Sequence, residues 1–435
     1  MNGLKLLTNC NFSYWFLLLL FALIALVIGN ICYEVVSKLN AQSFLDHFSD
    51  LLTSISITFF NNIIATILAI IIAFLITNYL YNKNFFKSSF LIILISFPHI
   101  SYCIGITYLF ATSGFFARLF AFFYGNDIPF ISERGDASSS LIYIISLALR
   151  EVPFLVLIGL SVLKKINALQ IQKQVLVLGH SNLSALLCCI FPIWLKSMGL
   201  PILIIVTFCF SNYEFSSILG PQFPHMINVK IIESWYSTNF DLIQQMNSLI
   251  IITILSSILA LTTLYILMQI LIGYLKNKKF SASSNYNLFL LGKIFYFMVI
   301  AIFTIILFIT SLLSIGESWF FPTIIPSNFS LRGFDYMVDN YLWLFFSSIL
   351  ISSLISILCL SFIVILIETS KETKSIYKFL FTISLMILVM PQNIMLISIT
   401  SLMEQLTFFS VSFWFYFSLF IYIVPYTYFM MKQSY

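Results

Sequence analysis

Charged residues are scarce in this sequence, at 9% of its 435 residues, while hydrophobic residues make up 60%. A soluble globular domain carries about 25% charged residues, and one this apolar would expose large hydrophobic patches to water. In a bilayer the same composition is expected, because placing an ion at the centre of a spanning helix costs about 2.5–3.5 kcal/mol. The composition excludes an ordinary soluble domain and predicts the lipid bilayer as the solvent of most of the chain.

Signatures of catalysis and of metal binding are missing as well. The sequence has no G-x4-G-K-[ST] motif, since Gly292-Lys293 lacks the upstream glycine and the following Ser or Thr, so no P-loop binds ATP. It has no H-E-x-x-H motif, its four histidines are scattered, and its seven cysteines form no C-x-x-C pair. The net charge of +5 is spread over short loops and is no nucleic-acid signature. We therefore expect neither an enzyme, a cofactor, a metal site nor a nucleic-acid partner.

Long apolar runs are what the sequence does contain. A membrane-spanning helix needs about 20 consecutive apolar residues, and we count about ten such runs. They are residues 14–35, 52–79, 90–111, 141–163, 198–216, 248–274, 294–313, 341–367, 380–402 and 408–431. No small-x-small cleavage site follows the first run, which favours an uncleaved first span over a signal peptide. The predicted fold class is an all-α integral membrane protein.

Basic residues fall mainly in every second loop. With the N-terminus inside, the inner loops hold Lys5, Lys83, Lys87, Lys164, Lys165, Lys173, Lys196, Lys276, Lys278, Lys279, Lys293, Lys371, Lys374, Lys378 and Lys432. The outer loops keep only Lys38, Arg118, Arg134, Lys230 and Arg332, together with most of the acidic residues. Because positive charge accumulates on the cytoplasmic side, we expect a multi-pass protein of the bacterial inner membrane with a cytoplasmic N-terminus.

Four of the predicted loops are longer than a plain turn. Three lie outside, at residues 112–140, 220–247 and 314–340, and are either docking surfaces for an external partner or ordinary connections. The fourth is the inner loop 164–197, in which Ala168, Ile171, Val175 and Leu178 recur at helical spacing before Gly179. A helix with one apolar side on the inner face is either a docking element for a partner subunit or a membrane-surface helix, and the pattern favours neither.

The inner loop resembles a motif of ABC importer permeases, which has the form EAA-x3-G-x9-I-x-L-P. The stretch K-Q-V-L-V-L-G-H-S-N-L-S-A-L-L-C-C-I-F-P places Gly179 on the motif's glycine and Pro192 on its proline. Lys173, Gln174 and Val175 stand where the family has Glu-Ala-Ala, so the scaffold of the motif matches and its signature letters do not. In the family this loop binds the ATPase subunit, and the resemblance implies the same for these five residues.

Other segments resemble the fused double permeases of the thiamine and iron(III) type. These are R-E-V-P-F-L-V-L before the motif, F-S-N-Y-E-F-S-S-I-L-G-P after it and W-F-F-P-T-I-I-P-S-N-F-S-L further on. Two copies of a pattern recur in order, with Pro98 matching Pro391 and Pro153 matching Pro425. The resemblance implies two homologous halves of the type I ABC importer kind, residues 1–280 with six spans and 281–435 with four. The second inner motif would fall beyond Tyr435, so we expect the second half to be incomplete.

The resemblance implies a permease that passes a small solute, thiamine-like or ferric iron, from a periplasmic solute-binding protein, driven by a separate ATPase. Arg150 and Glu151 are ionisable residues inside an apolar run, and such residues are functional candidates. Asn212 and Glu214 are the next candidates for the translocation path. For Arg150 and Glu151, ion pairs that only hold the bundle together are an alternative. For the chain, the alternatives are a secondary transporter and a membrane subunit of an enzyme complex.

Overall fold

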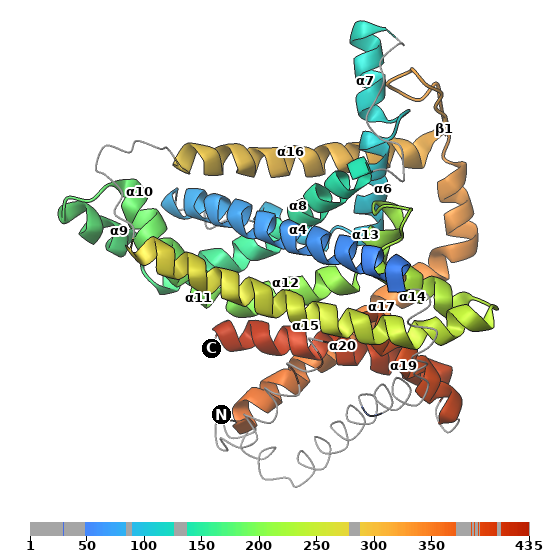
Figure 1. Cartoon of the computed structure of the whole chain (residues 1–435). Coiled ribbons are helices and arrows are strands. Elements are labelled where there is room, and N and C mark those ends of the chain that lie inside the picture. The colour runs from blue at the N-terminus through green and yellow to red at the C-terminus, as the bar shows by residue number, and fades with distance from the viewer. Residues whose placement is uncertain are drawn as a thin grey trace, which may run out of the picture. The chain divides into compact units, whose positions relative to one another are not determined.

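The computed structural model describes residues 48–83, 89–125, 137–277, 288–370, 392–406 and 410–434, with Gly29, Ser384, Ile387 and Met390 as isolated positions (Figure 1). The elements are α4 (Phe48–Asn82), α5 (Ser89–Ser96), α6 (His99–Phe110), α7 (Phe115–Tyr124), α8 (Ala137–Lys165), α9 (Ala168–Val177), α10 (Asn182–Ser184), the π-helix η1 (Ala185–Ile190), α11 (Phe191–Ser197), α12 (Gly199–Ser211), α13 (Tyr213–Ile218), α14 (Ile227–Tyr236), α15 (Phe240–Asn277), α16 (Leu288–Ile315), β1 (Gly316–Ser318), β2 (Asn328–Phe329), α17 (Arg332–Ser370), α19 (Gln392–Gln405) and α20 (Val411–Ser434). The predicted all-helical fold class is confirmed, apart from one short antiparallel hairpin.

The described chain forms two compact units. The first unit comprises Met1–Phe48, Lys230–Leu255 and Tyr336–Tyr435, and the second comprises Ser49–Val229 and Ser256–Asp335. These bounds follow packing in space, so they do not test the prediction of two homologous halves at 1–280 and 281–435, which stays a prediction.

Seven helices of the described residues are long and apolar enough to cross a membrane, or eight if one bent pair is a single span. Six of them coincide with the runs predicted at 52–79, 141–163, 248–274, 294–313, 341–367 and 408–431. The run predicted at 198–216 belongs to the pair Asn182–Ser197 and Gly199–Ser211, which is bent by 62°. Apart from Gly29, the run at 14–35 lies outside the described residues, and so does the part of the run at 380–402 before Gln392, apart from Ser384, Ile387 and Met390.

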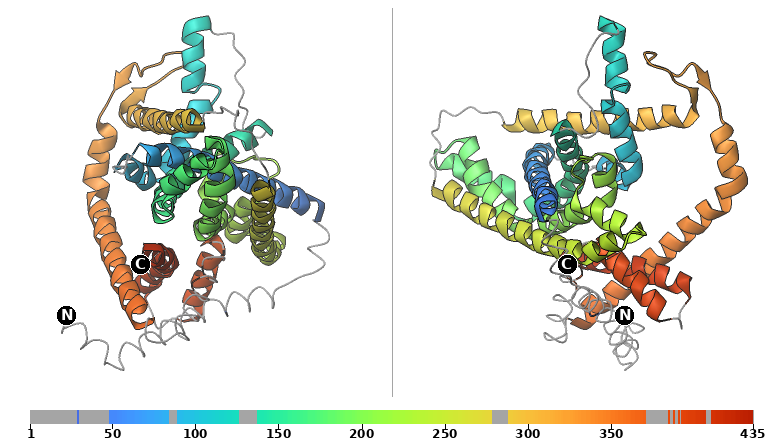
Figure 2. Two further views of the ribbon diagram at one scale, coloured as in Figure 1. Left: turned by 90° about the vertical axis from the view of Figure 1, so that its left-hand side faces the viewer. Right: turned by 45° about the vertical axis from the view of Figure 1, so that its right-hand side comes forward.

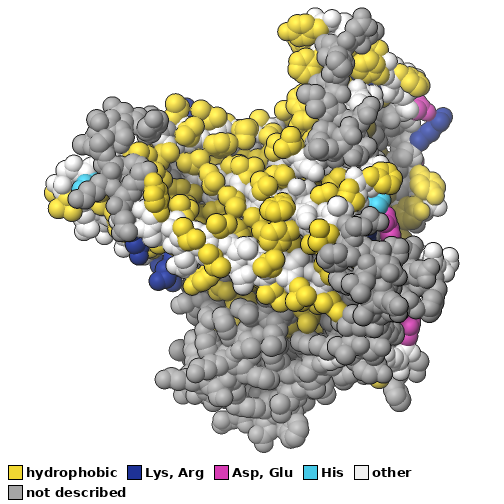
Figure 3. All heavy atoms as spheres, in the orientation of Figure 1, with side chains coloured by type: hydrophobic (Ala, Val, Ile, Leu, Met, Phe, Trp, Pro, Cys, Tyr) yellow, Lys and Arg dark blue, Asp and Glu magenta, His cyan; other side chains and the backbone are white. Residues whose placement is uncertain are grey.

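The run predicted at 90–111 as one span is wrong in its bounds. It is divided into α5 and α6 at Pro98, and the candidate span instead begins at His99 and ends at Tyr124. On the face drawn in Figure 3, hydrophobic side chains follow the lengths of the helices and charged ones gather at their ends. That distribution is the one a bilayer requires, since the apolar core excludes ions.

Small residues bring the helices of the second unit close together. Ala65, Ala69 and Ala73 are buried at spacings of four along one face of α4. On α8, a Cβ atom added to Gly159 would lie 2.9 Å from Nε1 of Trp194, which donates a hydrogen bond to the Gly159 carbonyl at 3.3 Å. Between apolar helices in lipid, such close approach and van der Waals packing supply most of the attraction. The close packing of the helices in this unit therefore depends on alanine and glycine residues at the contacts.

We expect Gly292→Ala to lower the melting temperature of the purified protein in detergent. Gly292 lies where α16 crosses α4, and a Cβ atom there would lie 2.2 Å from the carbonyl oxygen of Leu75. Overpacking of this kind costs about 1–3 kcal/mol. The matched control is Gly273→Ala on α15, where the added Cβ meets nothing within 4 Å. Equal melting temperatures for the two variants would contradict this packing of α16 on α4.

Candidate functional site

A break at Pro98 divides the span that sequence analysis expected to be continuous. Pro98 is the residue before α6, with φ −60° and ψ 138°, and the nitrogen of Tyr102 donates the first helical hydrogen bond to its carbonyl at 3.0 Å. Proline has no N–H, and it disfavours a helical conformation for the residue before it. The break leaves the last carbonyl groups of α5 inside the second unit, where they need donors.

Arg150 of α8 supplies those donors. Its Nη2 donates to the carbonyl oxygens of Phe97 at 2.8 Å and Ile95 at 3.1 Å. The side chain is only 5% exposed, and its Nε has no hydrogen-bond partner among the described residues. A cation beside the carbonyl end of a helix is electrostatically favourable. The side chain of Arg150 therefore holds the backbone of the broken span in place. Among the described residues, Arg150 forms no ion pair with a neighbouring helix.

The other predicted path residues lie around the first turns of α6. Glu151 is buried on α8, directly after Arg150, and Glu214 lies in α13 beside Phe215, whose ring packs on His99. The Tyr102 hydroxyl donates to the carbonyl of Ser146 on α8 at 3.2 Å. Arg150 thus lies at the Pro98 break, while Glu151 and Glu214 lie on α8 and α13, two helices that contact α6. Whether a solute passes there stays a prediction.

Asn212 has a local structural role. Its side-chain oxygen accepts a hydrogen bond from the nitrogen of Phe215 at 3.1 Å, which caps the start of α13. Phe215 in turn contacts His99, with ring centroids 6.3 Å apart, and His99 also contacts Phe208 at 5.1 Å. Capping by Asn212 therefore sets the position of the aromatic side chain that packs on the Pro98 break.

A second side chain that donates to the backbone next to a proline occurs in the first unit. Gln392 begins α19 directly after Pro391, and the hydroxyl of Tyr422 on α20 donates to the carbonyl oxygen of Gln392. Tyr422 lies three residues before Pro425, as Arg150 lies three residues before Pro153. In both places a side chain one turn before a helix-internal proline holds the backbone beside an earlier proline. Sequence reasoning matched the prolines and missed Tyr422, whose signal was this spacing.

The inner loop folds as a helix, a tight turn and a second helical segment. Gly179 has φ +82° and follows α9, with its nitrogen bonded to the Leu176 carbonyl at 3.0 Å and the His180 nitrogen bonded to the Val175 carbonyl at 3.2 Å. These two bonds form a Schellman motif, which needs a residue in the left-handed region and so favours glycine. The side chain of Ser181 then caps α10 by accepting from the Ser184 nitrogen at 3.1 Å. The predicted helix and glycine break are present.

Pro192 explains the irregular turn before it. It lies buried in the first turn of α11, directly after the π-helix η1. A proline ring clashes with the carbonyl four residues earlier, and a π-helical turn widens the helix at that point. The loop thus re-enters the bundle through Pro192, which cannot itself be a surface contact.

The C-terminal end of α9 and the residue after it expose aliphatic side chains. Val177 is 87% exposed, Leu178 is 74% exposed and Leu176 is also exposed, and we name these three residues the loop tip. Lys173 and Gln174 are exposed and Val175 is half-buried, so the segment predicted to dock lies one turn before the loop tip. Sequence analysis overlooked the loop tip, whose signal was three consecutive aliphatic residues before a glycine.

Comparison with known proteins identifies no family for this chain. No model of a known protein family matches the sequence, and searches of the curated proteins and of the solved structures found no match either. The described residues contain no group of three or more side chains that could hold a metal ion. What the structure defines is the class, a helical protein with the make-up of a multi-pass membrane protein.

Proposed function

We propose that this chain is the membrane-spanning permease of a binding-protein-dependent ABC importer in the bacterial inner membrane. The observation that carries the proposal is the inner loop, because it presents an exposed apolar loop tip between two sets of candidate spans. Exposed aliphatic residues that lie together mark a surface that another protein or a membrane covers. Under this proposal the covering protein is the separate ATPase, and the N-terminus lies in the cytoplasm with the loop.

The break at Pro98 supports a translocation path beside it. Discontinuous helices in transporters lie beside the substrate, because only there can irregular backbone find partners within a bilayer. Arg150 holds this break by its carbonyl groups. ATP binding by the partner would draw the docking loops together, and rocking of the halves would open the path alternately to each side.

The solute is a small molecule delivered by a periplasmic binding protein, thiamine-like or ferric iron by the resemblance of the motifs. Glu151 on α8 and Glu214 on α13 would attract a cation, and Arg150 is already engaged with carbonyl oxygens. A secondary transporter is the second candidate, and one observation favours it: Glu151 is a buried carboxyl group, as proton-coupled carriers use.

Co-purification with an ATPase tests the proposal. The chain is expressed with the ATPase encoded beside it, extracted in mild detergent and recovered through a tag on the permease. We expect the ATPase to be retained and ATP-dependent uptake of the solute to occur in vesicles. The control omits the tag on the permease. Uptake driven by a proton or sodium gradient without any ATPase would overturn the proposal and support the second candidate.

A further inference from the structure

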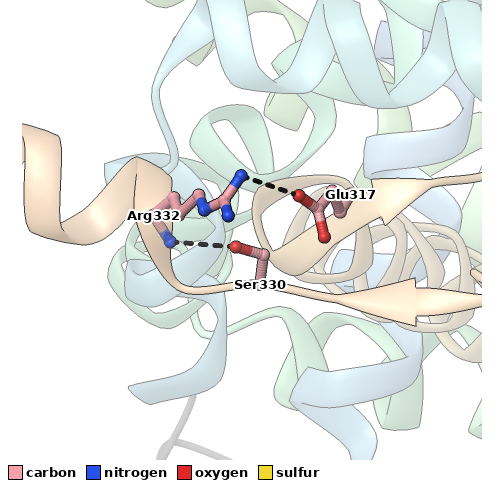
Figure 4. A network of polar contacts seen from close by, with 3 residues as sticks. All are labelled: Glu317, Ser330 and Arg332. Carbon is pink, nitrogen blue, oxygen red and sulfur yellow. Dashed lines mark hydrogen bonds and ion pairs between the residues drawn. The ribbon is translucent and has the colours of Figure 1, made fainter.

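The hairpin β1–β2 joins the ends of two candidate spans. Its strands pair Gly316 with Phe329 and Ser318 with Asn328, directly after α16 and directly before α17. Nη1 of Arg332 lies 3.3 Å from Oε1 of Glu317, and the Arg332 nitrogen donates to the Ser330 hydroxyl at 3.2 Å, which closes the base of the hairpin (Figure 4). Because both neighbouring helices are candidate spans, the hairpin lies at the boundary between lipid and water.

Arg118 attaches α7 to this hairpin. Its Nη1 donates to the carbonyl oxygens of Thr323 at 2.6 Å and Phe320 at 2.9 Å, and its Nη2 donates to that of Trp319 at 3.2 Å. Its Nε donates to the carbonyl of Ser113 at 2.8 Å, just before α7. The guanidinium also lies 5.1 Å from the centre of the Trp319 ring. The Arg118 guanidinium donates four hydrogen bonds to carbonyl groups, and the side chain is only 3% exposed, so its charge is shielded from solvent.

The outer surface of this assembly is aromatic. Phe122 is 70% exposed, Tyr124 is 77% exposed, and Phe123, Phe320 and Phe321 are exposed as well. We name these five residues the aromatic plate. They come from α7 and from the hairpin, which the Arg118 bonds hold together. Figures 1 and 2 show α7 running across the direction of α16 and projecting beyond it.

We propose that the aromatic plate lies in the lipid–water boundary and binds the upper acyl chains of the bilayer. Aromatic side chains are enriched in this region. The plate lies at the ends of two candidate spans, because the span His99–Tyr124 ends with α7 and the hairpin directly follows α16. We therefore assign bilayer lipid as the partner that covers the aromatic plate.

The chemistry of the plate also defines which lipids it needs. Interfacial helices that select anionic lipid carry exposed Lys or Arg on their polar face. The one charged residue of α7 is Arg118, and it is buried against carbonyl groups. The exposed Arg332 at the base of the hairpin is paired with Glu317. We therefore expect attachment through apolar area, with the same depth in neutral and in anionic bilayers.

Depth measurement by spin labels tests this inference on the full chain. A nitroxide is attached at Phe122→Cys or Phe320→Cys, in a background whose seven cysteines are replaced, after reconstitution into phosphatidylcholine vesicles. We expect both labels to favour collisions with oxygen over a water-soluble nickel complex several-fold more than a label at Lys173→Cys, an exposed polar position. A label at Ile357→Cys, exposed near the middle of α17, gives the reference for the bilayer interior.

Two further measurements make the outcome decisive. Adding phosphatidylglycerol to the vesicles is expected to leave the depths unchanged, and deeper labels in anionic vesicles would overturn the lipid assignment. Arg118→Gln is expected to release the hairpin, so that the label at position 320 moves toward water while the label at 122 stays. Labels at 122 and 320 as accessible to nickel as the one at 173 would refute the proposal, whether or not the chain transports a solute.

Discussion

Arg150→Ala is expected to lower the stability of the protein more than any other single substitution in the second unit. The change removes both hydrogen bonds to the carbonyl groups of Ile95 and Phe97. A buried polar group left without a partner costs about 1–3 kcal/mol, and water cannot enter freely in a bilayer to replace the lost donor. We therefore expect a clear fall in the melting temperature in detergent and loss of solute uptake in vesicles.

The variant Arg150→Lys distinguishes the contribution of the hydrogen bonds of Arg150 from that of its positive charge. A lysine keeps the positive charge but presents an ammonium in place of the planar guanidinium fork. We expect it to recover part of the melting temperature lost in Arg150→Ala. Amide hydrogen exchange over residues 92–106 should quicken in Arg150→Ala and return toward the wild-type rate in Arg150→Lys. Lys196→Ala, at an exposed position on α11, is the matched control for removing a cation. A wild-type melting temperature for Arg150→Ala would contradict the bonds at the break.

The positions of the helices could be predicted from the sequence because lipid demands long apolar runs. The ends of α4 and α8 fall within a few residues of the predicted runs, since Asn82 and Lys83 follow the first run and Lys164 and Lys165 follow the second. The turn at Gly179 was predictable for a similar reason. Only a residue that adopts a positive φ can end α9 in this way, and the amphipathic pattern stops at the same place.

The division at Pro98 could not be predicted in the same way. A proline within a span is compatible with a kinked continuous helix, as Pro153 in α8 and Pro425 in α20 show. The span breaks at Pro98 where Arg150, more than fifty residues later, donates to the freed carbonyl groups. Long-range donors of this kind leave no trace in a local pattern. The bonds of Arg118 to the hairpin could not be predicted for the same reason.

The similar sequence positions of Arg150 and Tyr422 bear on the predicted repeat. Each side chain lies one turn before a helix-internal proline and donates to backbone beside an earlier proline, but one donor is a cation and the other a neutral hydroxyl. If the halves are homologous, this difference makes the path asymmetric in charge.

Replacing the loop tip by serine, as Leu176→Ser, Val177→Ser and Leu178→Ser in one variant, is expected to abolish recovery of the ATPase. Burying one aliphatic side chain contributes about 1.5–3 kcal/mol, so three lost contacts correspond to an affinity at least about a hundredfold weaker. The melting temperature of the permease itself should hardly change, because the side chains of Val177 and Leu178 are exposed in the isolated chain. The measurement is the ratio of ATPase to permease after purification.

The control variant carries Lys173→Ser and Gln174→Ser, one turn earlier on the same helix. These exposed polar residues occupy the position of the family's signature letters, yet they add little apolar area, so we expect most of the ATPase to be retained. Loss of the ATPase in the control alone would place the contact on the predicted segment and not on the loop tip. Retention in both variants would mean that α9 is a membrane-surface helix, whose apolar tip is covered by lipid. That result would remove the main support for an ABC importer and leave the buried Glu151 as the better guide to what drives transport.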